Sequence, residues 1–100
     1  MTSEALDTDV VALSGDLDLA ATESTISLIV DQTTEVQVIV DLSAVDFMDS
    51  SGLHALVSAK SALEAESRTM ILTNPTPAIS TVLRITGLDE VFALPDPSPG

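Results

Sequence analysis

The chain has 100 residues, a formal net charge of −13 and no cysteine. This length allows one domain with one core, and the 45% hydrophobic content is typical of a folded protein. The lack of cysteine excludes disulfides, zinc–thiolate sites and thiol catalysis. All three basic residues follow position 59, and eleven carboxylates precede it, which disfavours nucleic acid and anionic membranes as partners and favours a basic protein. The sequence shows no signal-peptide pattern, and none of its apolar stretches approaches the roughly 18 residues that a membrane span requires. We therefore expect a soluble, cytoplasmic protein.

The first third of the sequence predicts a strand and then a helix. Residues 10–13 form an apolar run closed by Ser14 and Gly15, which indicates a strand followed by a turn. Ahead of it, residues 4–6 are compatible with a short edge strand and residues 7–9 with a turn. Apolar side chains between residues 19 and 31 recur at roughly helical spacing, so we expect a helix over residues 21–31.

The middle of the chain predicts a strand, a helix and a second strand. Residues 36–42 alternate β-branched and polar side chains, and Ile39 on the second face favours a parallel strand covered on both sides. Apolar residues recur through residues 53–63 at i, i+3, i+4 and i+10, which predicts a helix with one face on a sheet. Residues 69–73 form a short strand-like run.

The last quarter predicts one helix, one strand and a tail. Residues 74–77 (Asn-Pro-Thr-Pro) indicate a loop, a cap and a proline at the first helical position. Gly87 is a natural helix end, with Leu88 placed for the accompanying hydrophobic contact. Residues 91–94 are expected to form a final strand. The three prolines of residues 95–100 exclude a helix or central strand there, so we expect a domain over residues 1–94 and a disordered tail.

This order of elements indicates the fold class. Strands that alternate with helices imply a mainly parallel sheet with right-handed crossovers. We therefore expect a small α/β sandwich with a four- to five-stranded sheet and about three to four helices.

The segment Phe-Met-Asp-Ser-Ser-Gly-Leu (residues 47–53) is the most informative stretch of the chain. It places Ser50 and Ser51 where a loop becomes the start of a helix. Backbone N–H groups without partners and the positive end of the helix dipole stabilise a negative group there, so a serine suits a phosphate. The alternative is that Asp49, Ser50 or Ser51 simply caps the helix, and the two roles can coexist.

The sequence gives little support for a catalytic site or a metal site. Ser50 and His54 are four residues apart and share a helical face, but a catalytic pair lacks the G-x-S-x-G pattern and a third group behind the imidazole. The carboxylate pairs Asp16 with Asp18 and Asp46 with Asp49 are best interpreted as solvated turn residues, not as an acid–base pair or a metal site. The sequence predicts no enzyme.

Residues 38–53 (Val-Ile-Val-Asp-Leu-Ser-Ala-Val-Asp-Phe-Met-Asp-Ser-Ser-Gly-Leu) resemble the signature of STAS domains, specifically of bacterial anti-sigma factor antagonists. Residues 13–18 (Leu-Ser-Gly-Asp-Leu-Asp) resemble the G-E-L-D turn of that family, with Asp16 in place of glutamate. Residues 77–88 resemble its last long helix and the Gly-Leu that ends it. The resemblance spans roughly residues 10–94.

The resemblance implies a switch. Family members bind an anti-sigma factor that is a serine kinase, which then releases its sigma factor. The kinase phosphorylates the serine after the aspartate, here Ser50 with Ser51 as the second choice, and a PP2C-type phosphatase reverses this. No cofactor or metal is implied. We expect the partner-binding residues to be Asp18, Asp49, Ser50, Ser51, Gly52, Leu53 and His54. The alternative is a STAS module that is never phosphorylated and that docks through the same surface in a transporter or sensory complex.

Overall fold

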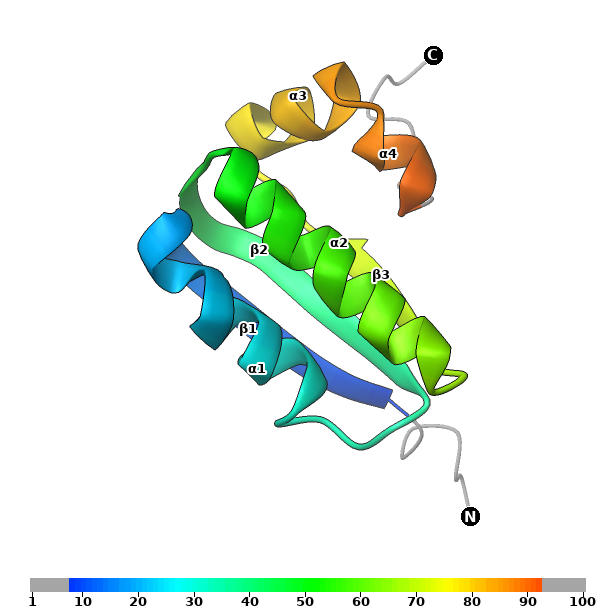
Figure 1. Ribbon diagram of the computed structural model, residues 1–100. Helices are drawn as coiled ribbons and strands as arrows, with labels where there is room; N and C mark the ends of the chain where they lie inside the picture. Colours follow the sequence, from blue (N-terminus) through cyan, green and yellow to red (C-terminus); the bar gives the residue numbers. More distant parts are fainter. Residues whose placement is uncertain (1–7, 93–100) are drawn as a thin grey trace.

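The computed structural model describes residues 8–92 (Figure 1). The three described strands form one parallel sheet in the order β1-β2-β3, which confirms the α/β fold with a parallel sheet. Helices and strands follow along the chain as β1 (Thr8–Leu17), the 3₁₀ turn η2 (Leu19–Ala21), α1 (Thr22–Val30), β2 (Gln37–Met48), α2 (Ser50–Ala65), β3 (Thr69–Thr73), α3 (Pro77–Ile85) and α4 (Leu88–Val91).

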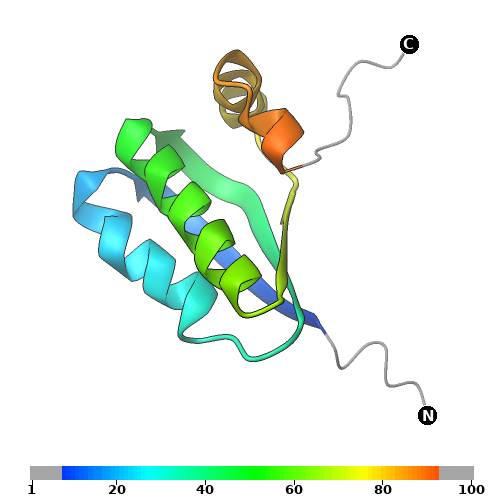
Figure 2. The same ribbon diagram turned by 45° about the vertical axis from the view of Figure 1, so that its right-hand side comes forward.

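The core lies between the sheet and two helices. Figures 1 and 2 show α1 and α2 side by side over one face of the sheet, with α3 and α4 beyond the end of β3. The central strand β2 supplies Val38, Val40 and Leu42 to this core, and α2 supplies Leu56 and Leu63; all five are fully buried. Each of these side chains stabilises the fold by roughly 1.5–3 kcal/mol relative to an exposed position. Packing of these side chains therefore holds α2 against the sheet.

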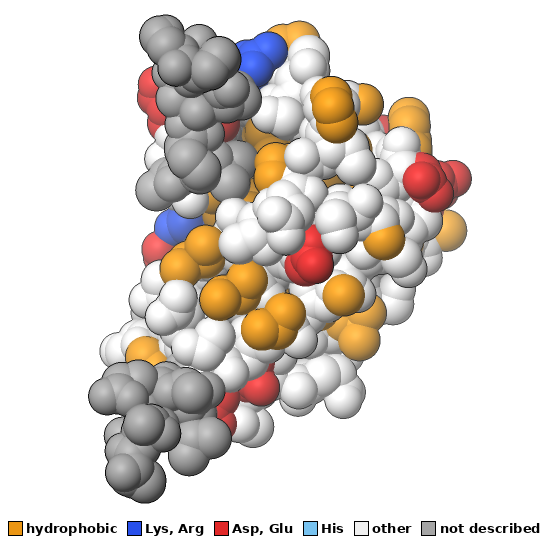
Figure 3. Space-filling view, turned by 180° about the vertical axis from the view of Figure 1, so that it is seen from behind, with side chains coloured by type: hydrophobic (Ala, Val, Ile, Leu, Met, Phe, Trp, Pro, Cys, Tyr) orange, Lys and Arg blue, Asp and Glu red, His pale blue; other side chains and the backbone are white. Residues whose placement is uncertain are grey.

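The other face of the sheet is not covered as the sequence predicted. Val10, Ile39 and Ile71 are neighbours in register across the three strands, and Ile39 is only half-buried. Viewed from behind, this face shows hydrophobic side chains and a carboxylate near its centre (Figure 3), whereas α1 and α2 lie over the opposite face (Figures 1 and 2). The expectation that β2 is covered on both sides is therefore wrong for the described residues.

β1 is longer than expected because its predicted turn is a bulge. Gly15 has φ of 77°, a left-handed conformation that glycine adopts without strain, and the strand pairing shifts register there. Pairing with β2 continues on both sides, so Ser14 and Gly15 bend the strand without ending it. Thr8 and Asp9 also belong to β1 and not to a turn. The expected edge strand at residues 4–6 lies outside the described residues.

The C-terminal region confirms the two helix signals and corrects the last strand. Thr76 caps α3 by accepting a hydrogen bond from the Ile79 N–H at 3.3 Å, and Pro77 is the first helical residue. Gly87 follows α3 with φ of 80°, and Leu88 packs against the core as predicted. Val91, however, ends the one-turn helix α4, so the expected strand over residues 91–94 does not begin there. Residues 93–100, including the expected tail, lie outside the described part. The described sheet thus has three strands where four to five were expected.

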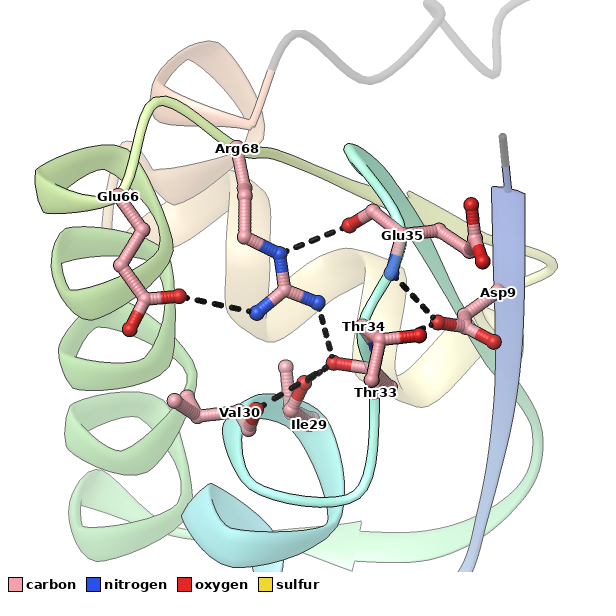
Figure 4. A network of polar contacts seen from close by, with 8 residues as sticks. All are labelled: Asp9, Ile29, Val30, Thr33, Thr34, Glu35, Glu66 and Arg68. Carbon is pink, nitrogen blue, oxygen red and sulfur yellow. Dashed lines mark hydrogen bonds and ion pairs between the residues drawn. The ribbon is translucent and has the colours of Figure 1, made fainter.

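Arg68 joins three parts of the chain at the amino end of the sheet (Figure 4). Its Nε donates to the Glu35 carbonyl oxygen at 2.8 Å and its Nη2 to the Thr33 hydroxyl at 2.7 Å. Its Nη1 contacts the Glu66 carboxylate at 3.1 Å. The guanidinium side chain is only 10% exposed, so these bonds replace most of its contact with water. The connection between α1 and β2 is thereby fixed to the start of β3.

Replacement of Arg68 is expected to destabilise the fold. Arg68→Met keeps much of the aliphatic stem but removes the donors to Glu35 and Thr33, which should lower the free energy of unfolding by about 2 kcal/mol. Urea denaturation measures the loss. Arg84→Met is the matched control, because Arg84 is exposed and its side chain makes no hydrogen bond within residues 8–92. Equal losses for the two variants would contradict a structural role of the Arg68 contacts.

Asp9 is an acidic residue that binds the same connection between α1 and β2 as Arg68 does. Its carboxylate accepts the N–H groups of Glu35 at 2.9 Å and Thr34 at 2.8 Å. These two bonds, and then the charge of Arg68, hold the pKa of the Asp9 carboxyl below its ordinary value of 3.8. Because the folded pKa lies below the unfolded one, the ionised group stabilises the fold above pH 3.8, and this contribution is lost as the pH falls through the lower, folded value.

An Asp9→Asn variant should therefore be less stable than the wild type at neutral pH. The difference in unfolding free energy should shrink as the pH is lowered through 3.8 and below, where wild-type Asp9 also becomes neutral. Urea denaturation over a series of pH values measures this. Asp31→Asn, at the exposed end of α1, is the control for the loss of one negative charge. A stability difference that stays constant down to pH 3 would contradict this role of Asp9.

Candidate functional site

The start of α2 is built by one aspartate cap. β2 ends at Met48, Asp49 is the N-cap, and Ser50 is the first helical residue. Asp49 Oδ1 accepts the N–H groups of Ser51 at 2.8 Å and Gly52 at 3.1 Å. Of the three residues that the sequence left open as the cap, Asp49 is therefore the one that fills this role. The expectation of unpartnered N–H groups is wrong for Ser51 and Gly52.

Gly52 lies where α2 touches the end of β1. A Cβ atom at this position would lie 2.3 Å from the Leu17 carbonyl oxygen and 2.8 Å from the Leu17 Cβ and the Met48 Cγ. The Asp49 N–H also donates to the Leu17 carbonyl, at 3.3 Å. The contact needs a residue without a side chain, which is the physical reason for glycine in the Asp-Ser-Ser-Gly sequence. Leu17 was not expected at this site, because only the tertiary contact reveals it.

The two serines differ in accessibility. Ser50 is exposed, and its hydroxyl makes no hydrogen bond with residues 8–92. Ser51 is half-buried, and Leu53 packs partly against the core. Of the two hydroxyls, the one on Ser50 is therefore more open to another protein.

His54 does not pair with Ser50. It is exposed on α2, and its Nε2 lies 3.3 Å from the Ser58 hydroxyl, one turn further along the helix. No hydrogen bond joins His54 to Ser50 within the described residues. The arrangement therefore lacks the contact by which a histidine base activates a serine nucleophile.

Asp18 reaches the same edge of the sheet as Asp49. The two parallel strands β1 and β2 end together, at the upper left of Figure 1, where α2 begins. Asp18 Oδ1 accepts the Ala21 N–H at 3.2 Å and so caps η2. Four aspartates lie at this edge, which we call the acidic edge: Asp16, Asp18, Asp46 and Asp49.

The acidic edge has no compensating positive charge in its own segments. Residues 14–19 and 43–54 contain no Lys or Arg. Nowhere in residues 8–92 do three or more His, Asp or Glu side chains gather as they would around a metal ion. Each helix in that range is also too short or too polar to cross a membrane. The site is thus an exposed serine hydroxyl in a strongly negative setting.

Comparisons with known proteins agree on the family. The model of the STAS domain matches residues 2–98. An anti-sigma F factor antagonist of Lysinibacillus sphaericus is 36% identical over 85 residues, which are 82% of this chain and 73% of the relative. The solved structure of the Bacillus cell fate determinant SpoIIAA in the phosphorylated form has a TM-score of 0.60 and 33% identity, and the match covers 84% of this chain and 78% of the other.

A more distant protein shares the fold alone. The crystal structure of a sulfate transporter family protein from Wolinella succinogenes has a TM-score of 0.76 at 18% identity, over 87% of this chain and 72% of that one. The match to the STAS domain model covers all the features described above: the parallel sheet, the Asp49 cap and the contact of Gly52 with Leu17. This chain belongs to the STAS domain family.

Proposed function

We propose that the chain is an anti-sigma factor antagonist. It binds an anti-sigma factor of the serine-kinase type, and phosphorylation of Ser50 by that kinase ends the binding and so regulates transcription. The observation that carries the proposal is the exposed Ser50 hydroxyl at the first position of α2, without a hydrogen bond to residues 8–92. The 36% identical relative named as an anti-sigma F factor antagonist supports the same role.

The chemistry requires only a positioned hydroxyl from this chain. The kinase transfers the γ-phosphoryl group of ATP to Ser50 Oγ, ADP leaves, and the hydroxyl proton passes to a base of the kinase or to water. Asp49 holds the first turn of α2 through two N–H groups, so its role is to fix the position of Ser50 and not to take the proton. Gly52 allows that turn to sit against Leu17.

The effect of the phosphate is electrostatic. A phosphate adds about −1.5 to −2 elementary charges. Because Asp49 already accepts the N–H groups of Ser51 and Gly52, the new group gains no hydrogen bond from those two and lies next to an existing carboxylate. In a complex, this charge is taken out of water against a surface that had accepted a neutral hydroxyl. The complex therefore loses affinity, while the fold of the chain is unchanged.

The proposal includes the rest of the cycle. The bound anti-sigma factor releases its sigma factor, and a PP2C-type phosphatase removes the phosphate from Ser50 to restore binding. This cycle operates in the cytoplasm. A docking module of a transporter or sensory complex is the second candidate, and the likeness to the sulfate transporter family protein, at 18% identity, bears on the fold and not on this choice.

Phosphate mapping tests the proposal. With the anti-sigma factor kinase of the same genome and ATP, we expect one phosphate per chain, on Ser50, detected by mass spectrometry of peptides. Ser50→Ala should abolish the modification and Ser51→Ala should leave it, because Ser51 is the less exposed of the two. An unchanged phosphopeptide in Ser50→Ala would contradict the assignment of Ser50. A complex that forms without any phosphate transfer would favour the docking module.

A further inference from the structure

Two exposed apolar side chains lie beside the acidic edge. Leu19 is 76% exposed and Phe47 is 50% exposed, although Leu17 and Met48, close to them in sequence, are almost completely buried. Leu19 is the first residue of η2 and Phe47 is the last but one of β2, so both lie at the end of the sheet where α2 begins. Single exposed apolar residues are common, but two at one functional edge are notable.

Each of these side chains has carboxylates next to it. Leu19 follows Asp18 directly, and Phe47 follows Asp46 and pairs in register with Asp16. Ser50 comes three residues after Phe47, with only Met48 and the capping Asp49 between them. Leu19, Phe47 and Ser50 therefore all belong to the segments that meet at the acidic edge.

We propose that Phe47 and Leu19 are the apolar anchors of the partner contact. This inference rests on the proposed function and names the chemistry of the partner surface: apolar recesses flanked by Lys or Arg. An interface with a buried apolar centre and a charged rim has this arrangement. The charge of the chain decides the occupant, because a second copy would bring the same aspartates against themselves, and an anionic membrane would be repelled.

The positive rim of the partner is compatible with inactivation by phosphate. Charges at a rim stay partly solvated and speed the encounter, whereas a phosphate at Ser50 is buried in the contact and must lose its water. Rim aspartates therefore act on the association rate, and the phosphate acts on the dissociation rate. Phe47 and Leu19 stabilise the formed complex, so their loss also acts on dissociation.

The test is surface plasmon resonance with the anti-sigma factor kinase of the same genome. Phe47→Ala should weaken binding at least about tenfold and Leu19→Ala about fivefold, mainly through faster dissociation. Val36→Ala and Val10→Ala are matched controls, with 58% and 66% exposure at the opposite, amino end of the sheet, and they should change affinity less than about twofold. Circular dichroism and Tm show that each variant is folded.

A second readout separates the acidic rim from the anchors. Asp16→Asn and Asp46→Asn should slow association and reduce its dependence on salt, while Asp31→Asn, at the far end of α1, should not. Should Ser50→Asp weaken the complex while Phe47→Ala and Leu19→Ala do not, the anchors are refuted and the proposed function stands. If the wild-type chain does not bind the kinase, the proposed function and the anchor role of Phe47 and Leu19 are both refuted. Loss of self-association and not of kinase binding in the anchor variants would also overturn the inference.

Discussion

Phosphorylated Ser50 is expected to weaken binding to the anti-sigma factor by roughly thirtyfold to several thousandfold. The range corresponds to the roughly 2–5 kcal/mol by which an unpaired charge destabilises an interface once it is buried. The Ser50 hydroxyl is exposed and the neighbouring cap is already occupied by Asp49, so the phosphate has no internal partner that would hide it. Isothermal titration of both forms with the purified kinase measures the difference.

Substitutions on the same helix calibrate this result. Ser50→Asp adds one negative charge and should weaken binding about tenfold or more, whereas Ser50→Ala should stay within about twofold of the wild type. Ser61→Asp is the matched control, because Ser61 is also exposed on α2 but lies about 16 Å further along the helix. Equal effects of Ser50→Asp and Ser61→Asp would mean that total charge, and not the position of Ser50, controls affinity.

The variant Gly52→Ala should lose both stability and binding. Alanine favours a helix over glycine by about 1 kcal/mol, but its Cβ would lie 2.3 Å from the Leu17 carbonyl oxygen, which belongs to a paired strand and cannot turn away. Because α2 must move away from β1, we expect a net loss of about 2 kcal/mol, or roughly 8–16 °C in Tm. Thermal unfolding followed by circular dichroism measures the shift.

The neighbouring residue provides the control for Gly52. Ser51→Ala removes one oxygen atom from the same turn and adds no atom near Leu17, so its Tm should change by no more than a few degrees. A Gly52→Ala protein as stable as the wild type would show that the end of β1 can shift at little cost in free energy. In that case the close contact would not be the reason for glycine at this position.

The elements with strong local signals were predicted well. The helix at the centre of the sequence has clear apolar periodicity, and the strand over Thr69–Thr73 is a short apolar run. Thr76 with Pro77 marks the start of α3 directly. The extension of β1 was missed because Ser14 and Gly15 are typical of a turn, and only pairing with β2 converts them into a bulge. The one-turn helix α4 is too short for any periodicity.

The place of Ser50 at the start of a helix was predicted, but the contacts of that helical turn were not. A Ser-Ser-Gly sequence after an aspartate is enough to indicate a hydroxyl at a helix start, and the structure places Ser50 there. The choice of Asp49 as cap was open, because three neighbouring residues can each fill that role. The contact of Gly52 with Leu17 joins segments 35 residues apart in sequence, so no local pattern contains it.

The Asp49 cap also bears on how fast such a protein can change state. Asp49 Oδ1, and not Ser50, accepts the first-turn N–H groups, so under the proposed function no helical hydrogen bond has to break when Ser50 gains or loses its phosphate. The response time of the protein is then governed by how often it meets the two opposing enzymes and by their turnover. The response time would therefore change with the amounts of those two enzymes, and no slow rearrangement of the chain would limit how short it can be.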